Sequence, residues 1–69
     1  MLNWNDLTNE EQEQAEISYL YILEDIATDG DIYDKVYYEM AREDPTFRLR
    51  GLQRRGFIRE DDGYIFVNI

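Results

Sequence analysis

Hydrophobic residues recur at helical spacing through the first part of the chain, which predicts a first helix over residues 8–28. Thr8 followed by Glu11 has the spacing of a capping box, and Gly30 is a natural stop after the last turn. The expected buried stripe consists of Ala15, Tyr19, Ile22 and Ile26, widened by Leu23 and Ala27.

A second helical pattern follows directly and predicts a helix over residues 31–42. Asp31 is a favourable N-cap residue for it. Its expected buried line is Ile32, Val36 and Met40, which lie one turn apart, with Tyr33 and Tyr37 alongside.

The third predicted helix covers residues 44–55 and carries four arginines. Asp44 suits the N-cap and Pro45 the first helical position, while Gly56 ends the helix. Leu49 and Leu52 lie three residues apart and set the direction expected to face the core. The second helix is expected to end near Ala41 or Arg42, and Pro45 begins the third after its N-cap, so at most residues 42–44 connect them and we expect a tight helix-turn-helix connection.

The last predicted element is a β-hairpin over residues 57–69, because two runs of aromatic and β-branched residues flank Asp62-Gly63. Residues 1–7 form a short arm whose Leu2, Trp4 and Leu7 are expected to lie on the core. The chain therefore reads as one domain of mainly α structure with a small β-hairpin, three helices followed by two strands.

The amino-acid composition narrows the range of functions that the chain can have. The chain has 69 residues, no Cys and no His, which argues against an enzyme, a metal site, a cofactor or a small-molecule substrate. No stretch approaches the ~20 apolar residues of a membrane span, and the N-terminus lacks the features of a secretory signal. We therefore expect a soluble, cytoplasmic protein without a membrane partner.

Charge is distributed unevenly along the chain, whose net charge is −9. Residues 1–34 carry ten acids and no base, whereas residues 35–59 hold all seven bases against three acids. The basic part includes the whole third helix, so a basic surface can exist on an acidic protein.

The third helix and the hairpin together resemble the winged helix-turn-helix family. The residues that carry the resemblance are Leu49, Leu52, Gly56, Phe57 and Ile58, followed by the hairpin over residues 59–69. The resemblance implies that residues 44–55 correspond to a recognition helix, which in this family commonly enters the major groove. Winged helices bind DNA, RNA or other proteins, so the resemblance alone does not fix the function. The arginines of the third helix lead us to expect a sequence-specific binder of double-stranded DNA, such as a transcriptional regulator.

A helical wheel supplies the candidate DNA-binding side chains. With Leu49 and Leu52 inward, Arg50 and Arg54 point outward and can reach guanine edges, while flanking arginines suit phosphates. Phe47 lies on the outward side in this projection, unless the helix is rolled so that its ring packs on a neighbouring helix. The full candidate set is Phe47, Arg48, Arg50, Gly51, Arg54, Arg55 and Arg59, the last at the base of the hairpin.

Two acidic regions keep alternatives open. The expected hairpin tip, Glu60-Asp61-Asp62, would be repelled by phosphates, and the first helix is dense with carboxylates. One alternative is a small acidic protein-binding module, as among phage-encoded inhibitors, in which Glu10, Glu13 and Glu16 mimic nucleic-acid charge or dock on a basic partner. Another is an interaction module joined through Trp4 and Tyr21. A single DNA-binding module of this size would bind modestly, which favours a homodimer on a two-fold site.

Overall fold

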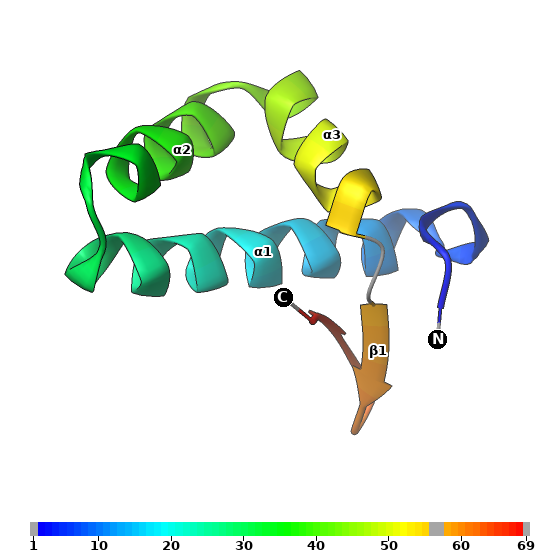
Figure 1. The fold of residues 1–69 in the computed structure, drawn as a ribbon. Helices are drawn as coiled ribbons and strands as arrows, with labels where there is room; N and C mark the ends of the chain where they lie inside the picture. Colours follow the sequence, from blue (N-terminus) through cyan, green and yellow to red (C-terminus); the bar gives the residue numbers. More distant parts are fainter. Residues whose placement is uncertain (1, 56–57, 69) are drawn as a thin grey trace.

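The computed structural model describes residues 2–55 and 58–68 and consists of three α-helices followed by a two-stranded antiparallel sheet (Figure 1). The expected mainly α structure with a small β-hairpin is confirmed. The elements are a short 3-10 helix η1 (Trp4–Asp6), α1 (Asn9–Asp29), α2 (Ile32–Glu43), α3 (Pro45–Arg55), β1 (Ile58–Asp61) and β2 (Tyr64–Val67).

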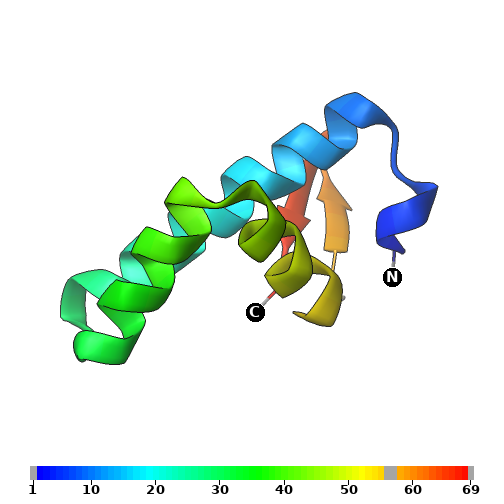
Figure 2. The same ribbon diagram turned by 90° about the horizontal axis from the view of Figure 1, so that it is seen from above.

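The long helix α1 is the element on which the others pack. The hairpin lies against its N-terminal half and α2 against its C-terminal half (Figure 2). The capping box is present, because the Glu11 N–H donates to Thr8 Oγ1 at 3.2 Å and the Thr8 N–H to Glu11 Oε1 at 2.8 Å. The buried residues of α1 follow one line, Ala15, Tyr19, Leu23 and Ala27. The buried stripe is therefore narrower than the expected one, because Ile22 is half-buried and Ile26 is exposed.

The helix α2 begins where the sequence predicts but presents a different face to the core. Asp31 and Asp34 form a reciprocal capping box at its start. The expected buried line of Ile32, Val36 and Met40 is wrong, because these three side chains are 67%, 49% and 46% exposed. Ala41 is instead the fully buried residue of α2, and its small side chain lets α2 pack closely against the core.

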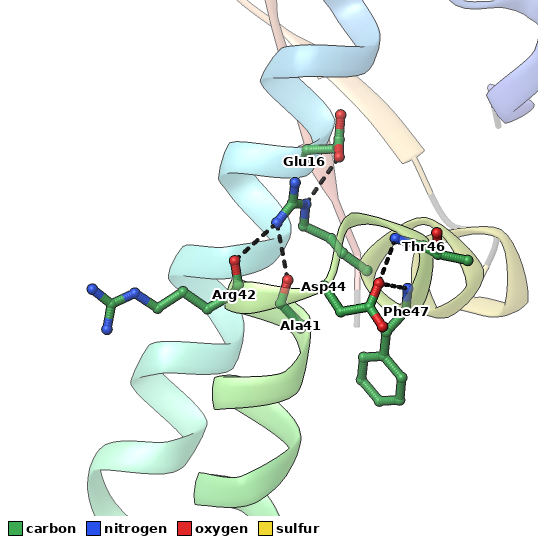
Figure 3. Close-up of polar contacts among 7 residues, drawn as sticks. Glu16, Ala41, Arg42, Asp44, Thr46 and Phe47 are labelled. Atoms are coloured by element: carbon green, nitrogen blue, oxygen red, sulfur yellow. Dashed lines mark hydrogen bonds and ion pairs between the residues drawn. The ribbon is translucent and has the colours of Figure 1, made fainter.

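A single residue, Asp44, separates α2 from α3. Its N–H donates to the Met40 carbonyl at 2.9 Å and so completes the last turn of α2. Its carboxylate Oδ1 accepts from the N–H groups of Thr46 and Phe47, at 3.0 and 3.2 Å (Figure 3). This double use makes the connection as tight as the sequence predicts and fixes the angle at which α3 leaves α2.

The hairpin is closed by the turn that the sequence predicts. Asp62 and Gly63 both have positive φ, 56° and 82°, as a two-residue turn with right-handed strand twist requires. The outer edge of β2 is attached to α1, because the Ile65 N–H donates to Gln14 Oε1 at 2.9 Å and the Val67 N–H to Ser18 Oγ at 3.2 Å. These bonds cover an edge strand that would otherwise offer free donors.

The N-terminal arm lies on the core, as expected, and also reaches the hairpin. Leu2 forms an antiparallel bridge with Ile58, with its N–H donating to the Ile58 carbonyl at 3.1 Å, and Leu7 is buried. The predicted helix end at Gly56 and the apolar residue Phe57 lie outside the described residues.

Candidate nucleic-acid interface

One side of α3 is polar, basic and open to solvent. Thr46, Arg50, Gln53 and Arg54 are all exposed and recur at intervals of four, three and one residues, so they share a side of the helix. We call these four residues the α3 outer face. Neither Arg50 nor Arg54 forms a salt bridge with any residue in the described part of the chain. Both guanidinium groups are thus free to bind a partner.

Arg48 points the other way and ties three helices together. Its Nε donates to Glu16 Oε1 on α1 at 2.9 Å, and its Nη1 to the Ala41 and Arg42 carbonyls at the end of α2, at 3.0 and 3.3 Å (Figure 3). The side chains of Arg48 and Glu16 are only 17% and 29% exposed. The expected phosphate-contacting role for Arg48 is therefore replaced by a structural contact, and Glu16 is not free for a basic partner.

Gly51 also faces inward, which corrects its expected outward position. It is buried, and a Cβ at this position would collide with the hydroxyl of Tyr19 and lie 2.9 Å from that of Tyr37. Phe47 follows the same roll of the helix, since its ring packs edge-on against Tyr37 at 5.0 Å between centroids. The alternative reading of Phe47, packing on a neighbouring helix, is the one observed.

Gly51→Ala is expected to lower the free energy of unfolding by about 1–2 kcal/mol, although alanine favours a helix by ~1 kcal/mol over glycine. The added methyl group must displace the Tyr19 hydroxyl, and Tyr19 is fully buried, so its ring has no room to move. Urea denaturation measures the loss. The same substitution in a Tyr19→Phe background should cost less, because the colliding hydroxyl is gone; an equal cost in both backgrounds would contradict this explanation.

Arg55 lies beside the same tyrosine pair. The Tyr19 and Tyr37 hydroxyls are hydrogen-bonded at 2.9 Å, and the Arg55 guanidinium lies 5.9 Å from the Tyr37 ring centroid. Desolvation lowers the pKa of Arg55, but the neighbouring Tyr19 and Tyr37 hydroxyls outweigh it and raise the pKa. Arg55 is half-buried, so it belongs at the inner edge of α3 and not to the α3 outer face.

The buried Tyr19 makes stability depend on pH in the alkaline range. Burial, followed by the Tyr37 hydrogen bond, raises the pKa of Tyr19 from 10.0 to about 12. Below pH 10 the hydroxyl is neutral in both states and stability is unaffected. Above it the unfolded chain loses the proton first, so stability falls by roughly 2 kcal/mol as pH rises to about 12. Denaturant titrations at pH 9 to 11.5 should show this fall in the wild type and a shallower one in Tyr19→Phe; equal slopes would contradict it.

The hairpin offers little basic surface. The Arg59 guanidinium lies 5.2 Å from the centroid of the Phe66 ring, and its Nη1 is 3.7 Å from Asp61 Oδ2. The tip residues Glu60, Asp61 and Asp62 are all exposed. Arg59 is therefore partly neutralised within the hairpin, and the tip is acidic.

The candidate protein-binding residues of the N-terminal half separate into two groups. Trp4 is half-buried against the core, and its carbonyl accepts from Gln12 Nε2 at 3.3 Å. Glu10 and Glu13 are exposed, and so is Tyr21, at 69%, beside Ile17, at 55%. Ile17 and Tyr21 border an open hollow of about 430 Å³ between α1 and β2, whose other walls include Tyr64 and Phe66.

The sequence pattern missed two members of the α3 outer face, Thr46 and Gln53. Both lie away from the outward direction that Leu49 and Leu52 predict when they are taken to face the core, whereas Leu49 is only half-buried. The helix is rolled so that Arg48, Gly51 and Leu52 face inward. The helix-breaking Gly51 was a signal of close packing that could have indicated this roll.

Metal-ligand clusters and membrane-spanning helices are both missing from the part of the chain that the structure describes. No group of three or more acidic side chains there is placed to hold a metal ion, and none of the helices is long and apolar enough to cross a membrane. Comparison with protein-family models, with curated proteins and with solved structures gives no match.

Proposed function

We propose that this chain is a winged helix-turn-helix protein that binds double-stranded DNA in a sequence-specific manner, as a transcriptional regulator does, through the α3 outer face. The observation that carries the proposal is the pair of guanidinium groups at Arg50 and Arg54, which form no salt bridge with the described residues and lie one turn apart on an exposed helix side. The order of elements, with a one-residue connection before α3 and a hairpin after it, supports the winged-helix assignment.

The side chains of the α3 outer face have the chemistry of direct readout. Arginine forms two hydrogen bonds to the O6 and N7 atoms of guanine, and glutamine can do the same with adenine N6 and N7. Threonine can bond a base or a phosphate, or contact a thymine methyl group. Arg50 and Gln53 are three residues apart and so can face neighbouring base pairs, with Arg54 and Thr46 beside them.

The acidic surfaces restrict how DNA approaches. The phosphate backbone carries one charge per ~1.7 Å of duplex, so it repels the hairpin tip at Glu60, Asp61 and Asp62. DNA is therefore expected to contact α3 while the hairpin tip stays off the duplex. Because few cations are offered, few counterions are released on binding, so nonspecific binding should be weak and only modestly dependent on salt.

The experiment that tests the proposal is selection from a pool of random duplexes by the purified chain at about 50 and 200 mM salt, the range over which phosphate contacts weaken measurably. The expected result is enrichment of a short motif, with affinity that falls as salt rises. The absence of any retained duplex at the lower salt, from a sample shown to be folded, would contradict DNA binding.

A protein partner on α1 is the second candidate function, and the exposed pair Ile17 and Tyr21 favours it. These side chains continue the exposed line of Glu10 and Glu13, so α1 presents carboxylates beside an apolar hollow. An inhibitor that acts on a basic protein would use this surface. Binding that survives Arg50→Ala/Arg54→Ala but fails in Glu10→Gln/Glu13→Gln would favour this candidate over DNA.

A further inference from the structure

A row of aliphatic side chains on α2 has no cover within the described chain. Ile32, Val36 and Met40 are 67%, 49% and 46% exposed, although they follow one another at four-residue intervals. They line a shallow groove together with Lys35, Glu39 and Glu43. We call these three aliphatic residues the α2 row. A contiguous row of this kind, bordered by charges, is typical of a surface that docks on a partner.

The α2 row has the geometry of a helix-packing ridge. Side chains at intervals of four form the ridge that most often interdigitates when two helices pack, with axes crossing at about −50°. Three members on a 12-residue helix cover most of its length, with Val36 at the centre. A second helix with an identical ridge fits such a surface, because each ridge can enter the groove beside the other.

Charges beside the α2 row favour a second copy in antiparallel orientation as the partner. Around the helix, Lys35, Glu39 and Glu43 all lie on one flank of the row, and Tyr33 lies on the other. A two-fold axis that lies in the interface at Val36, perpendicular to the helix, makes the two copies of α2 antiparallel. It brings the charged flank of one copy beside the charged flank of the other. It therefore places Ile32 opposite Met40 of the second copy, and Lys35 within reach of its Glu39.

A parallel arrangement lacks this match. It would place the charged flank of one copy opposite the Tyr33 flank of the other, and it would align the two helix dipoles unfavourably. We propose that two copies of this chain associate through α2, antiparallel about a two-fold axis at Val36, with Lys35 and Glu39 pairing across the interface. This goes beyond the proposed function, and its test requires no DNA.

The area available makes the dimer a weak one. A single helix pair buries less than the ~1,200 Å² of a standard stable interface, so association is expected only at micromolar or higher concentration. Sedimentation equilibrium of the purified chain between about 10 µM and 1 mM covers this range. The expected result is a reversible monomer–dimer equilibrium; a monomer at every concentration would overturn the proposal.

Substitutions locate the interface. Val36→Glu puts two carboxylates together on the two-fold axis and should raise the dissociation constant at least about tenfold. Ile26→Glu is the matched control, because it makes the same kind of change at an exposed aliphatic residue of α1 and should leave association unchanged. Circular dichroism establishes that both variants are folded. Wild-type association of a folded Val36→Glu variant would overturn the proposal.

The orientation is tested separately by exchanging charges. Lys35→Glu alone should weaken the dimer, and Lys35→Glu combined with Glu39→Lys should restore it, because the pairs re-form with opposite sign. Lys35 also donates to the Gly30 carbonyl at 3.0 Å, so the unfolding midpoint of each variant is compared with that of the wild type. A folded double variant that associates no better than Lys35→Glu would overturn the antiparallel pairing.

Discussion

Arg50→Ala/Arg54→Ala is expected to weaken binding to the selected duplex by at least about 30-fold, since each of the two bidentate contacts to a base contributes about 1–3 kcal/mol. Both side chains are exposed and lack a salt bridge within the described chain, so their removal should leave the fold intact. Fluorescence anisotropy with a labelled duplex measures the loss. The unfolding midpoint of the variant should equal that of the wild type.

Arg42→Ala is the matched control for this pair. It also removes an exposed arginine, but one that lies on α2 and pairs loosely with Glu39, at 3.9 Å between Nη1 and Oε1. Its effect on affinity should be limited to the small loss caused by a change in overall charge. If Arg42→Ala and the double variant weaken binding equally, net charge and not the α3 outer face accounts for the affinity.

Arg48→Ala is expected to lower the free energy of unfolding by about 2–3 kcal/mol, because it removes charge-assisted hydrogen bonds and leaves the partly buried Glu16 without its partner. It also removes the donor that satisfies two carbonyls at the end of α2. For a 69-residue domain this is a large fraction of the total stability. Urea denaturation at neutral pH measures the change.

Two variants separate this structural role from a general effect of charge. Arg50→Ala removes the same side chain from the exposed side of α3 and should change the unfolding free energy by less than ~0.5 kcal/mol. Arg48→Lys keeps the charge but loses the fork of donors, so it should retain only part of the stability. A fully stable Arg48→Ala variant would show that the contact with Glu16 contributes nothing.

The bounds of the elements were predictable because local signals specify them. The capping residues Thr8 and Asp31, the N-cap Asp44 and the turn at Asp62-Gly63 each act on the backbone within a few residues. Such signals depend on hydrogen-bond chemistry and φ preference and not on what the helix later packs against.

The faces of α2 and α3 were not predictable in the same way. On α2, aliphatic spacing suggested that the α2 row was buried, but Ala41 packs more closely and leaves the row exposed. On α3, the two leucines suggested one direction, whereas the tyrosine pair accepts only a glycine at Gly51 and turns Arg48 toward Glu16. Both outcomes depend on side chains distant in sequence, which no local pattern reports.

Arg55, which the sequence places among the DNA-binding candidates, lies outside the α3 outer face for the same reason. The sequence shows four arginines on one helix and does not say which of them are engaged. Tyr19 is 36 positions away from Arg55 (55 − 19), yet its hydroxyl helps to raise the pKa of the guanidinium at the inner edge of α3. The basic surface is therefore smaller than the count of arginines implies, and it includes the uncharged Thr46 and Gln53.

The most direct test of the central claim is a titration of the isotope-labelled chain with the selected duplex, or with a mixed-sequence duplex at low salt, followed by amide chemical shifts. Binding through α3 predicts the largest shift changes at Thr46, Arg50, Gln53 and Arg54, with little change at the hairpin tip. Changes concentrated at Glu10, Glu13 and Tyr21, or none anywhere, would contradict DNA binding by the α3 outer face.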